Sequence, residues 1–176
     1  MGDYRRMYAE TPGKRLEILS PASADDRAEN GSVFCHANTW AIIAECMLGR
    51  PENAWKYYHQ LLPMIAQKTA GAERYKAEPY VYSSNIFGPE SDKFGLANVS
   101  WLTGTAAWMY LAATQYLLGV RPTWDGLEID PCLPEHLLPA KVTRVFRGCR
   151  YEITITKNQK LSLPYVDGRE QLSVTV

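Results

Sequence analysis

Residues 38–65 read NTWAIIAECMLGRPENAWKYYHQLLPMI, and their pattern predicts two helices. In the first half, apolar side chains recur every three or four residues, as they do on one face of an amphipathic helix. That stripe consists of Trp40, Ile43, Ala44, Met47 and Leu48. Asn38 or Thr39 is the expected N-cap of this helix, and Gly49 is its expected C-terminal stop.

A second helix is expected directly after the first. Pro51 suits its first turn, because a proline there loses no intrahelical hydrogen bond. Its apolar stripe consists of Ala54, Trp55, Tyr58, Leu61, Leu62 and Ile65. The turn between the two helices is short, so the sequence predicts an antiparallel helical hairpin.

A third helix is predicted from Thr105 to Leu118, and Gly119 ends it. It is apolar on nearly every side, which predicts burial on most sides. Residues 69–102, which precede it, show no sustained period but are dense in aromatic side chains. We therefore expect an ordered, packed loop there, with at most one turn of helix.

Past residue 121 the period of the apolar side chains changes to two. Cys149, Tyr151, Ile153 and Ile155 alternate with polar residues, which predicts a half-buried strand. The meander is expected to continue through Leu161, Leu163, Leu172, Val174 and Val176. The predicted fold class is α+β, mainly α then β: an irregular lead-in over 1–33, a helical part over 34–120 and a small β-sheet domain over 121–176. One hairpin and one buried helix do not close a helical core, so we expect the chain to be part of something larger.

Composition excludes several functional classes. The 176 residues carry 19 Lys and Arg against 19 Asp and Glu, so broad electrostatic binding of nucleic acid is not expected. No signal peptide is expected, because no apolar segment follows the first residues, and no apolar run in the sequence reaches the length of a membrane span. The four cysteines form no CxxC pair and are expected to be reduced thiols. We therefore expect a cytoplasmic protein without nucleic-acid or membrane partners.

Two short motifs are candidates for binding an anion. His36 is expected just before the first helix, and Thr103-Gly104-Thr105 opens the third. His36 is either a packed core histidine or an anion ligand beside free helix N–H groups. Thr103 either only caps its helix or, with Gly104, admits a ligand close to the backbone. Carboxylates suited to glycosyl chemistry are present at Glu29, Glu45 and Glu78, and the histidines show no metal-ligand spacing.

Several longer motifs occur in series along the chain. They are ENGSVFCHAN (29–38), EPYVY (78–82), WLTGTAAWMY (101–110), LGVRP (118–122), DGLEIDPCLP (125–134) and Arg147-Gly148. In this order they resemble glycoside hydrolase family 94, which contains the cellobiose, cellodextrin, laminaribiose and chitobiose phosphorylases. The resemblance covers about residues 8–165. It implies the last helices of an (α/α)6 barrel followed by the C-terminal β domain of that family.

The resemblance also implies an activity, an inverting phosphorolysis of β-glucosides that yields α-glucose 1-phosphate. It places phosphate on His36, Thr103 and Gly104. No cofactor is implied, because inorganic phosphate is itself a substrate. The family's general-acid Asp and a phosphate-binding Arg lie upstream of the matched region, so the chain alone is expected to be inactive.

On the acceptor side, the resemblance implies substrate-binding roles for Glu29, Tyr80 and Ser84. Ala28 stands where the family often has Lys, and Ser84 where several members have Gln, which argues against a plain cellobiose phosphorylase. The expected partners are a sugar and phosphate, together with a second copy of the chain or the missing upstream domains. The alternative is a non-catalytic module derived from this family that binds carbohydrate or a protein partner.

Overall fold

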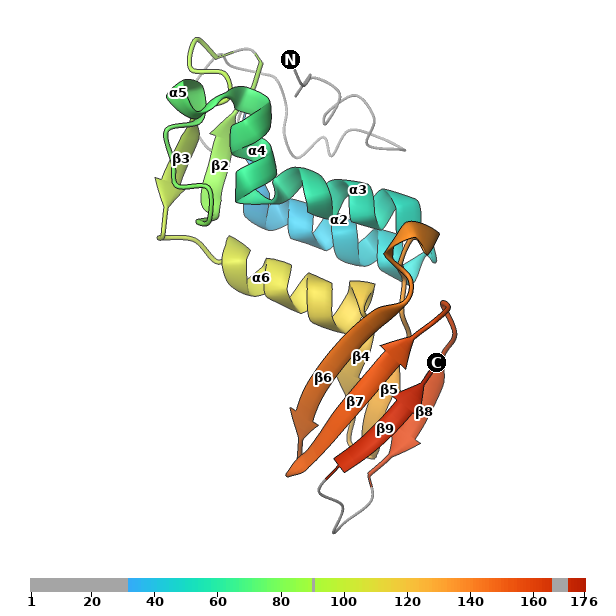
Figure 1. The fold of residues 1–176 in the computed structure, drawn as a ribbon. Coiled ribbons are helices and arrows are strands. Elements are labelled where there is room, and N and C mark those ends of the chain that lie inside the picture. Colours follow the sequence, from blue (N-terminus) through green and yellow to red (C-terminus); the bar gives the residue numbers. More distant parts are fainter. Residues whose placement is uncertain (1–31, 90, 166–170) are drawn as a thin grey trace. The chain divides into compact units, whose positions relative to one another are not determined.

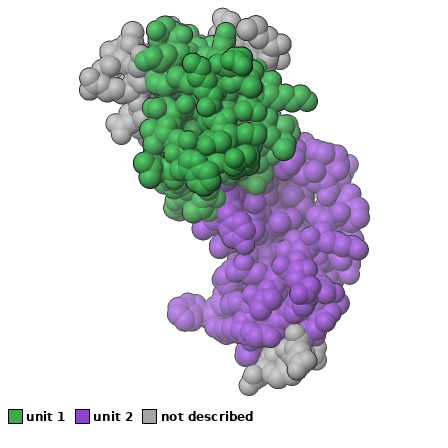
Figure 2. Space-filling view, turned by 60° about the vertical axis from the view of Figure 1, so that its left-hand side comes forward, with its two compact units in different colours: residues 1–40, 58–108 green, residues 41–57, 109–176 purple. Residues whose placement is uncertain are grey.

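The computed structural model describes residues 32–89, 91–165 and 171–176. The predicted irregular lead-in therefore lies almost entirely outside the described residues. The chain divides into two compact units (Figure 2). Unit 1 comprises residues 1–40 and 58–108, and unit 2 comprises residues 41–57 and 109–176.

The described part of the chain confirms the α+β class, with helices first and most strands later (Figure 1). The α-helices are α2 (Cys35–Met47), α3 (Pro51–Leu61), α4 (Pro63–Ala70), α5 (Ala72–Tyr75) and α6 (Thr105–Leu111). A π-helical segment, Ala112–Leu117, continues α6, and a short 3₁₀ helix spans Glu135–Leu137. Membership of these helices in an (α/α)6 barrel stays a prediction.

Helix α2 begins three residues earlier than its predicted cap. The amide of Asn38 donates to the carbonyl of Phe34 at 2.8 Å, and the hydroxyl of Thr39 donates to the carbonyl of His36 at 2.6 Å. Both side chains therefore bond to carbonyls of the preceding turn, so the predicted N-cap at Asn38 or Thr39 is wrong. As a consequence, His36 lies in the first turn of α2 and not before it.

The predicted second helix is two helices. Leu62 separates α3 from α4 and has φ −60° and ψ 127°, while Pro63 occupies the first position of α4. A residue before proline is driven out of the helical region by the proline ring. The periodicity of the apolar stripe through Ile65 concealed this break.

The third helix is present but is less buried than predicted. Met109, Ala112 and Leu117 are buried, whereas Ala106, Ala107 and Tyr110 are exposed. Its last part is π-helical, with Leu118 N–H donating to the Ala113 carbonyl at 2.8 Å. Although its composition is apolar on nearly every side, this helix has one buried face and one exposed face.

In unit 1, a three-stranded antiparallel sheet replaces much of the loop expected over 69–102. Its order is β1 (Ser32–Phe34), β2 (Ser83–Phe87), β3 (Ala97–Ser100). These strands are short and rich in Ser and Asn, so they lack the alternation that predicts strands. The expected helical turn is confirmed as α5, and the expected packing is confirmed for Tyr75 and Phe87, which are buried.

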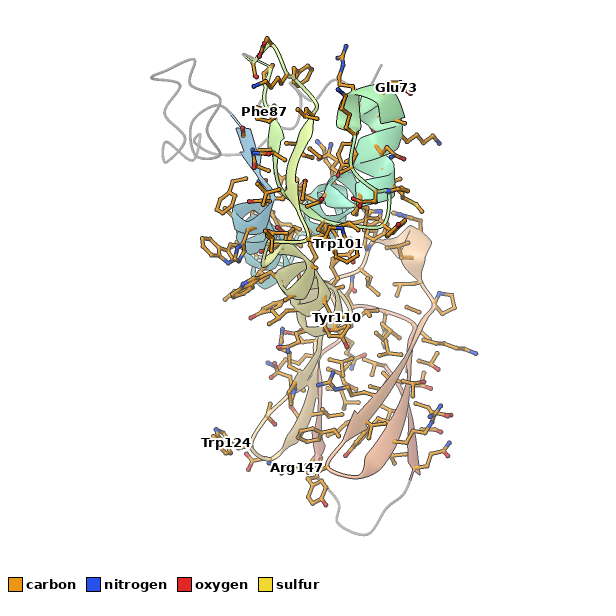
Figure 3. The ribbon with its side chains drawn as sticks, turned by 90° about the vertical axis from the view of Figure 1, so that its left-hand side faces the viewer. Glu73, Phe87, Trp101, Tyr110, Trp124 and Arg147 are labelled. Atoms are coloured by element: carbon orange, nitrogen blue, oxygen red, sulfur yellow. The ribbon has the colours of Figure 1, made fainter. Side chains whose placement is uncertain are left out.

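In unit 2, the predicted strands exist but pair differently from a meander. One sheet has the order β4 (Val120–Pro122), β5 (Gly126–Ile129), β8 (Leu161–Pro164). The other has the order β6 (Ala140–Phe146), β7 (Cys149–Ile155), β9 (Gln171–Thr175), with β7 and β9 parallel. Figure 3 shows Trp124 and Arg147 at the tips of the β4–β5 and β6–β7 hairpins, at the same end of the two sheets. Alternation along a strand predicts its faces but not its neighbours, and the pairing was therefore missed.

Candidate functional site

His36 lies in unit 1, immediately after β1, among aromatic rings. The centroid of its imidazole is 6.0 Å from that of Phe34, 5.6 Å from that of Trp40 and 5.8 Å from that of Trp108. The rings of Trp40 and Trp108 also meet edge to face at 6.2 Å. Since Trp40 is one helical turn after His36, α2 itself presents both rings on one side.

Gly104 lies directly beneath this imidazole, although 68 positions (104 − 36) separate the two residues. A Cβ built on Gly104 would be 3.0 Å from Cε1 of His36, 3.3 Å from Nδ1 and 3.6 Å from Nε2. A contact of 3.0 Å is closer than side chains normally allow. Glycine is therefore the residue that permits this approach of ring and backbone.

Thr103 and Thr105 hold the segment around Gly104 in place. The backbone N–H of Thr105 donates to Oγ1 of Thr103 at 3.2 Å, and the two hydroxyls are 2.7 Å apart. Thr105 is fully buried and donates its hydroxyl to the Ser83 carbonyl of β2 at 3.3 Å. The capping role considered for Thr103 is thus observed, and its half-buried hydroxyl faces the start of α6.

One polar atom of this cluster is unpartnered. Nε2 of His36 is buried and forms no hydrogen bond with any residue that the structure describes. Buried polar atoms are almost always paired, because leaving one unpaired costs about 1–3 kcal/mol. An imidazole, a hydroxyl and a backbone approached through a glycine are groups that bind an oxyanion. The arrangement is therefore suited to a small anion.

Two of the remaining predicted site residues, Tyr80 and Ser84, lie just before or on β2. Tyr80 is 75% exposed in the turn before β2. Ser84 is half-buried on β2, on the opposite face from Ser83 and Asn85. Glu29 lies outside the described residues. The structure thus brings together His36, Thr103 and Gly104, and it places Ser84 next to Ser83, whose carbonyl accepts the hydroxyl of Thr105.

The other two candidate carboxylates have structural partners. Glu78 accepts a hydrogen bond from the indole N–H of Trp101 at 3.3 Å in unit 1. Glu45, in unit 2, accepts one from Asn53 at 3.3 Å and lies 3.7 Å from the guanidinium of Arg50. Among the described residues no group of three or more His, Cys, Asp or Glu side chains could hold a metal ion. No helix in that part of the chain is long and apolar enough to cross a bilayer.

Comparison with known proteins decides the family. The model of the "Glycosyl hydrolase 94 superfamily, catalytic domain" matches residues 19–119, which include the whole cluster around His36. The chain belongs to the glycosyl hydrolase 94 superfamily. Its membership was expected from the motifs, and it is confirmed.

The relatives of this superfamily member include phosphorylases of different specificity. Solabiose phosphorylase of Paenibacillus borealis is 38% identical over 81% of the chain and 19% of its own length. N,N'-diacetylchitobiose phosphorylase of Vibrio proteolyticus is 42% identical over 76% of the chain and 16% of its own length. The cyclic beta-(1,2)-glucan synthase NdvB of Rhizobium meliloti is 34% identical over 78% of the chain and 5% of its own length. The chain thus spans a fifth or less of these relatives.

Sequence reasoning missed two aromatic residues at the candidate site of this superfamily member. Trp40 and Trp108 flank the imidazole, but each also fits the apolar stripe of its helix and was read as core. Trp40 is 54% exposed, so it is not a core residue. The spacing could have identified them. Trp40 is four residues after His36 and Trp108 is four residues after Gly104, and side chains four residues apart on a helix are neighbours.

Proposed function

We propose that the chain is the C-terminal segment of an inverting β-glucoside phosphorylase and supplies part of its phosphate site. In the proposed reaction, inorganic phosphate attacks the anomeric carbon of a β-glucoside. The products are α-glucose 1-phosphate and the shortened acceptor. The phosphorylase relatives support this reaction class, and the cluster of His36, Thr103 and Gly104 supports the phosphate-binding role.

The single observation that carries the proposal is the buried, unpartnered Nε2 of His36 beside the backbone of Gly104. A phosphate oxygen bonded to this nitrogen would satisfy it. The Thr103 hydroxyl is on the adjacent residue and offers a second polar group to the same anion. A ring held by three aromatic neighbours is also preorganised, so little entropy is lost when the anion binds.

The proposed phosphorolysis requires fewer catalytic groups than hydrolysis by an inverting enzyme does. Because phosphate is the nucleophile, one general acid suffices and no water-activating base is required. We propose that this acid lies in a part of the protein outside the present chain. The role left to His36, Thr103 and Gly104 is to orient the phosphate and offset its charge near the sugar.

The acceptor side is proposed to involve Glu29, Tyr80 and Ser84. Tyr80 presents most of its ring to solvent, as a residue that stacks on a sugar must. The relatives are named for different substrates, including solabiose, N,N'-diacetylchitobiose and a glucopyranosyl glucuronide. We therefore propose that these three positions distinguish acceptors, while the cluster at His36 serves the shared phosphate.

Titration calorimetry of the chain with inorganic phosphate tests the proposal, beside His36→Ala. His136→Ala is the matched control, because His136 is an exposed histidine in the other unit. Binding that disappears in His36→Ala and persists in His136→Ala is the expected result. Folded wild-type chain that gives no heat with phosphate would contradict a preformed site.

A non-catalytic binding module is the second candidate, and exposed apolar side chains favour it. Trp101 and Leu102, directly after β3, are 68% and 84% exposed. Such residues commonly mark an interaction surface. Sedimentation tests this: dimerisation that is lost in Leu102→Ser favours the module, and a monomer at all concentrations contradicts it.

A further inference from the structure

Unit 2 contains a cavity of about 710 Å³, and its lining includes no residue of the cluster around His36. Two cysteines line it, Cys46 near the end of α2 and Cys132 shortly after β5. Arg121 and Asp130 line it as well, and they form an ion pair with 2.7 Å between Nη2 and Oδ2. The charged groups at the cavity are thus already paired, and the thiols are its reactive groups.

Local hydrogen bonds determine where each cysteine lies. The N–H of Gly49 donates to the carbonyl of Cys46 at 3.0 Å, and α2 ends one residue after Cys46. The N–H of Cys132 donates to the carbonyl of Leu117 at 2.9 Å, and that of Asp130 to the carbonyl of Gly119 at 2.9 Å. Both backbones are therefore anchored at the cavity wall by bonds that involve neither thiol.

The two thiols interact with each other. A side-chain hydrogen bond between them lowers the pKa of Cys132 and, together with burial, raises that of Cys46. Such a pairing distinguishes a thiol that ionises readily from one that remains protonated. This division is typical of dithiols in which one sulfur attacks and the other resolves.

The other two cysteines do not line the cavity, although they are buried as Cys132 is. Cys35 is buried in unit 1, with its Sγ 3.9 Å from Oγ of Ser83, and burial raises its pKa to about 12. Cys149 is buried on β7. A metal role for the pair is not favoured, because the described residues contain no third ligand grouped with them. All four cysteines are free thiols in this structure.

We propose that Cys46 and Cys132 are a redox-active dithiol that a small disulfide such as glutathione disulfide converts to an intramolecular disulfide. The Cys132 thiolate attacks one sulfur of glutathione disulfide, breaks its S–S bond and releases one glutathione thiolate, which takes up a proton. The Cys46 thiol then loses its proton, attacks Sγ of Cys132 in the mixed disulfide and expels the second glutathione. Two protein thiols are oxidised, and one glutathione disulfide is reduced to two glutathione molecules.

The new bond would join the last turn of α2 to the segment after β5, within unit 2. Closing a loop from residue 46 to residue 132 restricts the unfolded chain strongly, so the oxidised form is expected to melt at a higher temperature. The modification would thereby stabilise unit 2 without involving any residue of the proposed phosphate site.

Oxidation of the complete 176-residue chain with glutathione disulfide tests the proposal. Remaining thiols are blocked with N-ethylmaleimide, and intact mass and peptide maps are recorded. Free thiols counted after denaturation are expected to fall from four to two, with a loss of two hydrogens and one linked peptide pair containing Cys46 and Cys132. Dithiothreitol should restore all four thiols.

Single variants show the order of the steps. In Cys46→Ser, oxidation is expected to stop with one glutathione on Cys132, and in Cys132→Ser neither adduct nor disulfide should form. Cys35→Ser is the matched control and should oxidise as the wild type does. A wild-type chain that retains four thiols, keeps a glutathione adduct, or links Cys35 or Cys149 would overturn the proposal. The wild-type peptide map decides the matter even if a variant fails to fold.

Discussion

The imidazole of His36 lies against the backbone of Gly104, so closely that a methyl group on Gly104 would be 3.0 Å from Cε1 and 3.3 Å from Nδ1. His36 lies in the first turn of α2, and Gly104 directly precedes α6. The sheet of unit 1 joins them, because Thr105 donates its hydroxyl to the carbonyl of Ser83 on β2. The candidate site is therefore a product of strand pairing as much as of its motifs.

Gly104→Ala should weaken phosphate binding while leaving the fold intact. The backbone of Gly104 is not in the left-handed region, so alanine fits the chain, but its methyl group displaces the imidazole. Affinity in titration calorimetry should fall about tenfold or more, which corresponds to about 1.4 kcal/mol. Ala107→Ser, at an exposed position of the same helix, should bind phosphate normally. Equal affinity of Gly104→Ala and wild type would remove Gly104 from the site.

Thr103→Val should reduce both stability and phosphate affinity. Valine keeps the shape but removes the oxygen that accepts the N–H of Thr105. Loss of such a cap costs about 1 kcal/mol in thermal or urea unfolding, and Thr103→Ser should restore most of it. Thr114→Val is a control, because the Thr114 hydroxyl only donates back to the carbonyl of Tyr110 on the same helix. If Thr103→Val and Thr103→Ser lost equal stability and affinity, the hydroxyl of Thr103 would not be the group responsible.

Acid should destabilise unit 2 through Glu128. Hydrogen bonds from Lys160 and then Arg121, both at 2.7 Å, lower the pKa of Glu128 below its usual value of about 4.3. A carboxyl with a depressed folded-state pKa stabilises the fold above its unfolded pKa, and this contribution is lost as pH falls through the folded value.

Glu128→Gln should therefore lower the free energy of unfolding by about 1 kcal/mol or less at pH 7, since the pair is partly exposed. The difference from wild type should shrink as the pH falls below about 4. Urea unfolding at several pH values measures it, with Glu135→Gln, an exposed position of the same unit, as the control. A difference that is constant with pH would contradict the assignment to the charge of Glu128.

Gly119→Ala should disrupt unit 2. Gly119 has φ +69°, and a Cβ there would overlap the carbonyl of Asp130. Because the overlapped carbonyl belongs to the backbone of Asp130, it cannot move aside cheaply, and we expect a loss of about 3 kcal/mol or more in chemical unfolding. Gly49→Ala is the matched comparison for Gly119→Ala, because Gly49 has φ +65° but open space around the added atom. Its free energy of unfolding should fall only by the backbone strain, about 1 kcal/mol. If both variants lost similar stability, the chain would have relieved the overlap with Asp130 by a small shift.

Local patterns predicted the positions of the main helices and of β7 well, but not β6, which is as long as β7. The three-and-four spacing from Trp40 to Leu48 located α2, and the alternation from Cys149 to Ile155 located β7 to the residue. The helix ends were less accurate, since Asn38 and Thr39 resemble caps in sequence but bond backward to carbonyls. Pro63 was the visible signal for the break between α3 and α4.

The sequence by itself determined which residues carry the family motifs, because these are runs of neighbouring residues whose identity needs no fold. It also determined the α+β class, through periodicities that arise from the geometry of helix and strand. The meeting of His36 and Gly104 was implied by the family resemblance, and the tertiary structure supplies its geometry; tertiary structure alone decided that Cys46 meets Cys132 and that β9 runs parallel to β7. Each of these depends on pairing between segments far apart in the chain, which local spacing does not encode.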